Sequence, residues 1–250
     1  MSDEYVYTPE DFLGWAIQSG WTPGTLPIGV VFTFQAPVTR ALVESGKFEE
    51  NRELTVSNAT MLMTSDDEVP VLIACLNPGA VAMATQLEHL RFLGDETRYA
   101  AAVGTAGALT ADYLIGETVL IHSALRSDAV SNAYLAPSVH VDADPELTAA
   151  LERRMPGVAT ARTWTVSVPY RSTRSDLEAA IEGGASLVEM EVASLFAVGQ
   201  RLGISAAAAL IVSDVARVDG WEVDWSDTTG PTVHAVTAAV NAMRDLVENS

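Results

Sequence analysis

The sequence predicts a single-domain α/β protein, in which helices flank a mixed, mostly parallel, twisted central sheet. Charge-free apolar runs rich in β-branched residues alternate along the chain with segments of helical periodicity. Strands that are apolar on both faces are typical of parallel sheets covered by helices on both sides. With 250 residues, 48% of them hydrophobic, and no long polar tract, the chain can bury the core of one compact domain.

The first half of the chain begins with a helical pattern. Thr8 and Pro9 have the residue types of an N-cap and a first helical position, which predicts a helix over 9–19. Asn77 and Pro78 open a second helical pattern, which stops at Gly94. The remaining apolar runs of this half predict strands over 27–34, 69–75, 99–109 and 116–125, the third of which is expected to run into a Gly-rich turn.

The second half continues the alternation. Helical patterns predict helices over 146–155, 175–184, 191–203 and 234–249. Apolar runs predict strands over 161–170 and 205–214. The acidic, Trp-bearing segment 221–231 is expected to be either a lid after the last strand or an ordinary surface loop.

Charge and cysteine content exclude several classes of function. The formal charge is −19, from 33 acidic and 14 basic residues, whereas nucleic acids and anionic membranes need a basic surface. No apolar run approaches the length of a membrane span, and the first residues lack a signal-peptide pattern, so we expect a cytoplasmic protein. The single Cys75 allows no intrachain disulfide, and four scattered histidines give no metal-like spacing, so neither a metal nor another cofactor is expected.

The predicted fold places a ligand site at the carboxyl ends of the strands. Three segments fall there: 104–107 (GTAG), 169–171 (PYR) and 213–214 (SD). The glutamates of SLVEMEVASLF, Glu189 and Glu191, lie on the same side, at a predicted helix start. Carboxylates favour the first turn of a helix for electrostatic reasons alone, but residues two apart point in different directions and their neighbours are apolar. At least one of the two should therefore point into a site.

Two further patterns have both a structural and a functional interpretation. The segment 104–107 can be only a tight turn, because glycine serves turns in any fold. Asp214 ends a very apolar strand, where a carboxylate commonly caps a turn or helix. A partly buried carboxylate at this position can instead act as a general acid.

Three stretches of the chain carry a specific resemblance. VEMEVASLFAVGQRLGISAAAALIVSD (188–214), AVGTAGAL (102–109) and RSDAVSNAYLAP (126–137) resemble motifs of the purine and uridine nucleoside phosphorylase family, which includes the methylthioadenosine/S-adenosylhomocysteine nucleosidases. NPGAVAMATQLEHL (77–90) matches the helix before the family's Gly-rich turn. The resemblance implies an N-terminal helical extension over 1–26 and a nucleoside phosphorylase-like α/β domain over 27–250.

The resemblance implies cleavage of the N-glycosidic bond of a nucleoside. Glu191 would bind the ribose hydroxyls, with Met190 beneath the sugar ring and Glu189 in support. A carboxylate near the sugar suits the oxocarbenium-like transition state of this reaction. Asp214 would hydrogen-bond or protonate N7 of a purine, and Tyr170 would stack on the base.

The resemblance is weaker at the phosphate site. Arg40, Arg52 and Thr105 are the candidate phosphate ligands, and Arg52 resembles an arginine that the family lends across a dimer interface. Ala102 stands where the family's third arginine would be. The nucleosidase branch instead activates water with a glutamate in the loop after the first strand, where this chain has Pro37.

Three functions therefore stay open from the sequence. The first is phosphorolysis of a purine-type or modified nucleoside to free base and ribose 1-phosphate, with inorganic phosphate as co-substrate. The second is hydrolysis of such a nucleoside, or a repurposed reaction in a specialised pathway. The third is a non-catalytic nucleoside binder, which retention of Glu191, Met190 and Asp214 together argues against. The resemblance also implies a homo-oligomer, either a dimer or a trimer of dimers.

Overall fold

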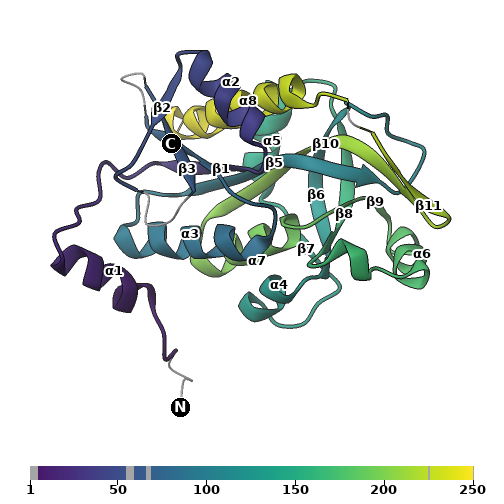
Figure 1. Ribbon diagram of the computed structural model, residues 1–250, viewed down its shortest axis with the longest axis horizontal. Helices are drawn as coiled ribbons and strands as arrows, with labels where there is room; N and C mark the ends of the chain where they lie inside the picture. Colours follow the sequence, from purple (N-terminus) through teal and green to yellow (C-terminus); the bar gives the residue numbers. More distant parts are fainter. Residues whose placement is uncertain (1–4, 55–58, 66–68, 225, 250) are drawn as a thin grey trace.

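The structure is a computed structural model that describes residues 5–54, 59–65, 69–224 and 226–249. It confirms the predicted class, a single α/β domain in which helices flank one large mixed sheet (Figure 1). The helices are α1 (Pro9–Gln18), α2 (Ala36–Glu44), α3 (Ala80–Leu93), α4 (Ala129–Tyr134), α5 (Pro145–Arg154), α6 (Arg174–Glu182), α7 (Val192–Leu202) and α8 (Thr229–Glu248), with a 3-10 turn, η1, at Pro169–Arg171.

The strands form a sheet in which a linear half continues into a closed half. They are β1 (Gly29–Thr33), β2 (Phe48–Glu50), β3 (Thr60–Thr64), β4 (Val71–Cys75), β5 (Tyr99–Ala108), β6 (Thr118–Ser127), β7 (His140–Asp142), β8 (Ala159–Val166), β9 (Ala185–Glu189), β10 (Ser205–Arg217) and β11 (Gly220–Val223). The linear half runs β5-β1-β4-β3-β2. In the closed half, β5, β10, β6, β8 and β9 each pair with the next, and β9 pairs back to β5.

Two apolar layers hold the helices onto the sheet. On one face, side chains of α3 and α7 such as Leu87 and Phe196 pack on the strands in a continuous buried cluster. On the other face, α2, α5 and α8 contribute Leu42, Leu151 and Val240 to a second cluster. Figure 1 shows α2, α5 and α8 on one side of the sheet and α3 and α7 on the other. Both faces are therefore buried, as the charge-free strand sequences require.

The predicted helices and strands are present, with shifted ends. The N-cap hydroxyl of Thr8 accepts a hydrogen bond from the N–H of Asp11, and Pro9 is the first helical residue, as expected. The long helix predicted from Asn77 begins later, after Gly79. The division of the chain at residue 27 stays a prediction, and residues 1–4 and 250 of the two predicted parts lie outside the described residues.

Three expectations were wrong in detail. Residues 104–107 are not a turn but part of β5, which pairs with β10 along its whole length. Glu189 does not start a helix, because it is the last residue of β9. The strand predicted to end at Asp214 continues to Arg217 and turns back through β11. The segment 221–231 thus begins as a strand, while Trp225 within it lies outside the described residues.

The sheet is also less parallel than predicted, for a related reason. Most antiparallel pairings involve strands that the sequence reading did not find, namely β2, β3, β7, β9 and β11. The exception is β10 with β6. Strands β2, β7 and β11 are only three or four residues long and largely exposed, which leaves little apolar pattern to detect.

Candidate active site

A pocket of about 460 Å³ lies where several strands end. Phe34 follows β1, Val166 ends β8, Glu189 ends β9, and Thr105 and Asp214 belong to β5 and β10. The carboxyl ends of β1, β8 and β9 meet here, which is where an α/β sheet is expected to bind ligands.

Glu189 is a buried structural carboxylate at one side of this pocket. Its Oε2 accepts hydrogen bonds from the backbone N–H groups of Glu191 (2.6 Å) and Val192 (2.7 Å), at the start of α7. Its Oε1 accepts from the hydroxyl of Thr165 and, at 3.5 Å, from that of Thr163. Glu189 therefore satisfies free donors at the helix N-terminus and fixes how the chain enters α7.

Glu191 is held differently, so that half of its carboxylate faces the pocket. Its Oε1 accepts a hydrogen bond of 2.5 Å from the N–H of Gly79, which precedes α3. Among the residues that the structure describes, no further hydrogen bond with good geometry reaches its Oε2, although the backbone N–H of Met190 also acts on this carboxylate. Met190, half-buried between the two glutamates, also lines the pocket. A carboxylate oxygen with spare acceptor capacity, beside an apolar side chain, can accept hydrogen bonds from a bound polyol.

The two glutamates hold protons more strongly than ordinary carboxyl groups. Burial and the neighbouring charge of Glu191 raise the pKa of Glu189, while its hydroxyl and N–H donors act in the opposite direction. Burial raises the pKa of Glu191, and the N–H of Gly79 lowers it. The pair therefore titrates as one coupled site in which two full negative charges are unfavourable.

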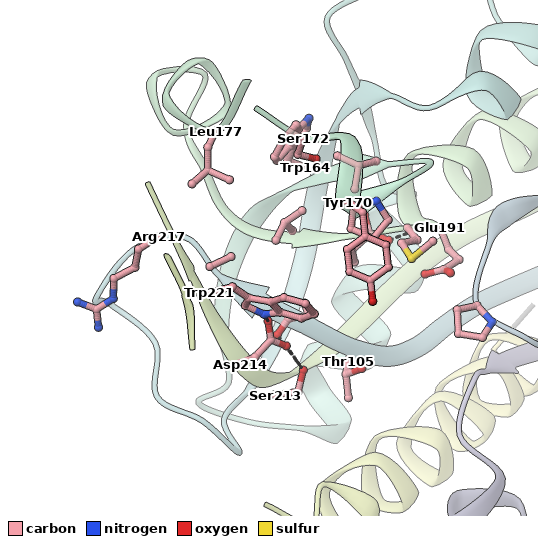
Figure 2. Close-up of a pocket in the computed structure, with 18 of the residues that line it drawn as sticks. Thr105, Trp164, Tyr170, Ser172, Leu177, Glu191, Ser213, Asp214, Arg217 and Trp221 are labelled. Atoms are coloured by element: carbon pink, nitrogen blue, oxygen red, sulfur yellow. Dashed lines mark hydrogen bonds between the residues drawn. The ribbon is translucent and has the colours of Figure 1, made fainter. Parts of the chain in front are cut away.

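Asp214 stands on the other side of the pocket, on β10. Its Oδ1 accepts a 2.6 Å hydrogen bond from the hydroxyl of Ser213, and its Oδ2 accepts a 2.5 Å bond from Nε1 of Trp221 (Figure 2). A Cβ atom added to Gly107 would come within 2.8 Å of Asp214 Oδ2. The second glycine of the GTAG segment thus leaves room for this carboxylate, rather than making a turn.

Two aromatic side chains stand at the mouth of the pocket. Tyr170, in η1, is 82% exposed, and its ring lies 6.3 Å from that of Trp221 at an interplanar angle of 59°. Figure 2 shows the Trp221 ring beside Asp214 and the Tyr170 ring between Trp221 and Glu191, whereas the guanidinium of Arg217 points away from them. The two rings thus offer aromatic surface on which a planar ligand in this pocket can stack.

The three predicted phosphate ligands do not meet within one chain. Thr105 lines the pocket and is half-buried. Arg40 is exposed on α2 and is not a lining residue. Arg52 is also outside the lining, with its side chain 83% exposed and paired to Glu50 at 3.0 Å. Any anion site at Thr105 therefore lacks these guanidinium groups in the single chain.

Several residues that line the pocket are not among the site residues that the sequence predicts. They are mostly apolar or aromatic: Phe34, Pro78, Trp164, Val166, Leu177, Val188 and Trp221. Pro78 and Val188 lie inside motifs that carry the family resemblance, and Trp221 lies in the acidic segment after Asp214. The others look like ordinary core or loop residues in the sequence.

The described residues form neither a metal site nor a membrane-spanning helix. Within the described ranges, no three His, Cys, Asp or Glu side chains gather as metal ligands would. None of the helices there is both long and apolar enough to cross a membrane.

The α/β fold thus carries, at the ends of its strands, a pocket lined by a pair of glutamates and an aspartate, as in enzymes that act on small molecules. The sequence profile of the phosphorylase superfamily matches residues 27–247, and the chain belongs to that superfamily. It is accordingly an enzyme that acts on nucleosides at the N-glycosidic bond, and the resemblance drawn from its motifs is confirmed.

One curated relative and two solved structures are similar to this chain, the latter two in fold. A guanosine phosphorylase of Halorubrum lacusprofundi is 28% identical over 175 residues, which are 68% of this chain and 67% of that protein. A purine nucleoside phosphorylase of Toxoplasma gondii has a similar fold, with a TM-score of 0.75, 18% identity, and coverage of 90% of this chain and 93% of that one. An AMP nucleosidase of Bacteroides thetaiotaomicron has a TM-score of 0.71 and 19% identity, with coverage of 98% and 100%. The same fold therefore occurs in a protein named as a phosphorylase and in one named as a nucleosidase.

Proposed function

We propose that this chain cleaves the N-glycosidic bond of a purine-type nucleoside to give the free base. The observation that carries the proposal is the arrangement of one pocket, with Glu191 and Met190 on one side and Asp214 on the other. A nucleoside has the same two ends, a polyol that hydrogen-bonds a carboxylate and a base whose nitrogens need an acid partner.

The glutamate side suits the sugar. Oε2 of Glu191 accepts hydrogen bonds from the ribose 2′- and 3′-hydroxyl groups, while Gly79 keeps Oε1 in place. Met190 packs under the sugar ring. As the bond to the base breaks, positive charge develops on the sugar, and a fixed carboxylate stabilises that charge more than it stabilises the neutral ground state. Glu189 supports this geometry by holding the N–H of Glu191.

The aspartate side suits the leaving base. The electron pair of the C1′–N9 bond moves onto the purine, and Asp214 gives its proton to N7, so that the base leaves neutral and Asp214 remains as a carboxylate. General acid catalysis of this kind contributes about 10²–10⁴-fold to a rate. Tyr170 contributes a ring against which the base stacks.

Phosphate is the first candidate for the attacking group. The guanosine phosphorylase relative favours it, and Thr105 offers a hydroxyl in the pocket. A homo-oligomer would supply the missing positive charge, because the exposed Arg52 of a second copy can reach a site that Arg52 of the same chain does not line. Arg40, exposed on α2, is the second candidate cation.

Water is the alternative attacking group. One observation favours it: neither Arg40 nor Arg52 lines the pocket of its own chain. Loss of a charge-assisted hydrogen bond weakens phosphate binding by about 1.5–3 kcal/mol. Against hydrolysis, residues 27–43 contain no Asp or Glu to activate water, and Gln35 is engaged with Thr228 and Thr232 of the α8 region.

Release of free base in the presence and absence of phosphate tests the proposal. Guanosine, inosine and adenosine are incubated with the chain in both buffers, base is quantified chromatographically, and the sugar product is identified by phosphorus NMR. We expect base release that depends on phosphate and yields ribose 1-phosphate. Equal release in both buffers would establish hydrolysis instead, and no release from any nucleoside would overturn glycosidic cleavage.

A further inference from the structure

The hairpin formed by β10 and β11 brings an aromatic side chain back to Asp214. β10 continues past Asp214 to Arg217, and β11 returns antiparallel, with Ala216 opposite Trp221 and Asp214 opposite Val223. The indole of Trp221 thereby reaches back along the hairpin to the carboxylate, although Trp221 itself is 56% exposed. A contact so close from an exposed aromatic residue calls for a role.

The chemistry of this contact is one-directional. An indole N–H can only donate, so the 2.5 Å bond from Nε1 uses a lone pair of Asp214 Oδ2. Ser213 donates to the other oxygen, Oδ1, at 2.6 Å. Both oxygens thus receive a donor, so the two bonds fix the orientation of the carboxyl group, and hydrogen bonds to a charged acceptor are about twice as strong as neutral ones.

We infer that Trp221 is a positioning residue for the acid step: its indole N–H orients Asp214 and stabilises the carboxylate that remains once the proton has moved to the base. This inference rests on the proposed glycosidic cleavage. The bond strengthens as the proton leaves Asp214, so Trp221 stabilises the transition state more than the ground state. Arg217, whose guanidinium points away in Figure 2, does not share this task.

Trp221→Phe tests the inference, because it removes the indole N–H donor while keeping a smaller aromatic ring beside Tyr170. Two substrates are compared: the purine nucleoside that the unaltered chain cleaves fastest, and its N7-methylated form. The methylated base already carries a positive charge and leaves without a proton. We expect W221F to lower kcat on the ordinary nucleoside by about 10- to 100-fold with little change in KM, and to leave the methylated nucleoside unaffected.

Two controls separate this role from a structural one. Trp15→Phe makes the same chemical change on α1, outside the pocket, and should keep the activity of the unaltered chain on both substrates. In a double-mutant cycle, adding W221F to Asp214→Asn should cause no further loss on the ordinary nucleoside, because Trp221 acts through Asp214.

The outcomes are distinct. Equal losses by W221F on both nucleosides, or no loss on either, would overturn the inference. If W221F does not fold, the indole N–H signal of Trp221 is compared between NMR spectra of D214N and of the unaltered chain. A shift of this signal supports the contact between Trp221 and Asp214, and an unchanged signal overturns the inference. Failure of the unaltered chain to cleave either nucleoside would instead count against the proposed function.

Discussion

Glu189 and Glu191 show how two identical side chains, two residues apart, acquire different tasks. Both carboxylate oxygens of Glu189 accept hydrogen bonds from backbone N–H and hydroxyl groups around the start of α7. One oxygen of Glu191 accepts a hydrogen bond from the N–H of Gly79, and the residue lines the pocket. The sequence suggested that at least one of them points into a site, but it could not say which, because that depends on donors brought from β8 and from the α3 N-terminus.

The shared burial of these glutamates predicts a pH effect on stability. Because their pKa values are raised above the ordinary value of 4.5, the folded chain binds more protons than the unfolded chain above that pH. The free energy of unfolding should therefore fall as pH rises from about 5 to 8. Glu191→Gln removes the charge that repels Glu189, so the free energy of unfolding of this variant should fall less steeply with pH than that of the unaltered chain. Urea unfolding at several pH values measures the slope for each protein.

The exposed Glu49→Gln on β2 is the matched control for this experiment, and it should retain the slope of the unaltered chain. Parallel slopes for E191Q and the unaltered chain would show that the two glutamates do not share a proton.

Asp214 marks the limit of residue-level prediction. Its position after a very apolar strand and its place in the VEME…SD spacing were legible in the sequence. Its partner Trp221 was not, because that contact exists only if the chain reverses at 218–219 into a four-residue, exposed strand. Gly107 was misread for a similar reason: the space it leaves is needed by a side chain 107 residues later.

At the scale of elements, a buried polar network ties α4 to α7. Asp128 accepts hydrogen bonds from the N–H and hydroxyl of Ser131 and from the hydroxyl of Ser194 on α7. Arg126 donates to Ser131 and to carbonyl and hydroxyl groups of residues 135–138. The RSDAVSNAYLAP motif thus holds α7, the helix that follows Glu189 and Glu191, in place through these hydrogen bonds.

Asp128→Asn should therefore destabilise the fold. An amide offers one acceptor where the carboxylate has two, so some buried donors lose their partner at a cost of about 1–3 kcal/mol in the free energy of unfolding. Asp95→Asn, which alters an exposed ion pair with Arg91, should cost at most about 1 kcal/mol. Urea denaturation of both variants measures the difference, and similar losses would contradict a bracing role for Asp128.

The elements themselves were predictable to the extent that they were long and apolar. Helices α3, α7 and α8 and strands β5, β6 and β10 carry strong periodic signals and were found. Strand β9 was missed because its ASLVE sequence runs directly into the helical pattern of α7, leaving no Gly or Pro to mark the boundary. Where only two residues, Met190 and Glu191, separate a strand from a helix, periodicity alone cannot place the boundary.

For the whole molecule, the open question is how a pocket rich in carboxylates would bind an anion. Three carboxylates line it, from Glu189, Glu191 and Asp214, and the chain carries a net charge of −19. In a homo-oligomer, Arg52 of one copy could bind the anion at the pocket of another copy and so supply the missing positive charge.

Mixing of inactive variants tests this arrangement. Arg52→Ala and Glu191→Gln should each lose most phosphate-dependent turnover. In mixed dimers one of the two sites combines an intact Arg52 with an intact Glu191, so unfolding and refolding the two together should restore about a quarter of the activity. No recovery would argue that Arg52 acts within its own chain or not at all.

Thr105→Ala mixed with E191Q provides the control. Both residues line the same pocket of one chain, so every mixed site lacks one of them and activity should not return.

The closed circuit of β5, β10, β6, β8 and β9 also determines how a ligand can come and go. Thr105, Asp214 and Glu189 are carried by three of these strands. Because each strand of the circuit is bonded to two neighbours, none can peel away without breaking ladders on both of its sides. Any movement that admits or releases a ligand is therefore expected in the exposed β10–β11 hairpin and the η1 turn, where Trp221 and Tyr170 meet. If a ligand enters or leaves between these two rings, their separation is a step distinct from the chemistry and can limit turnover on its own.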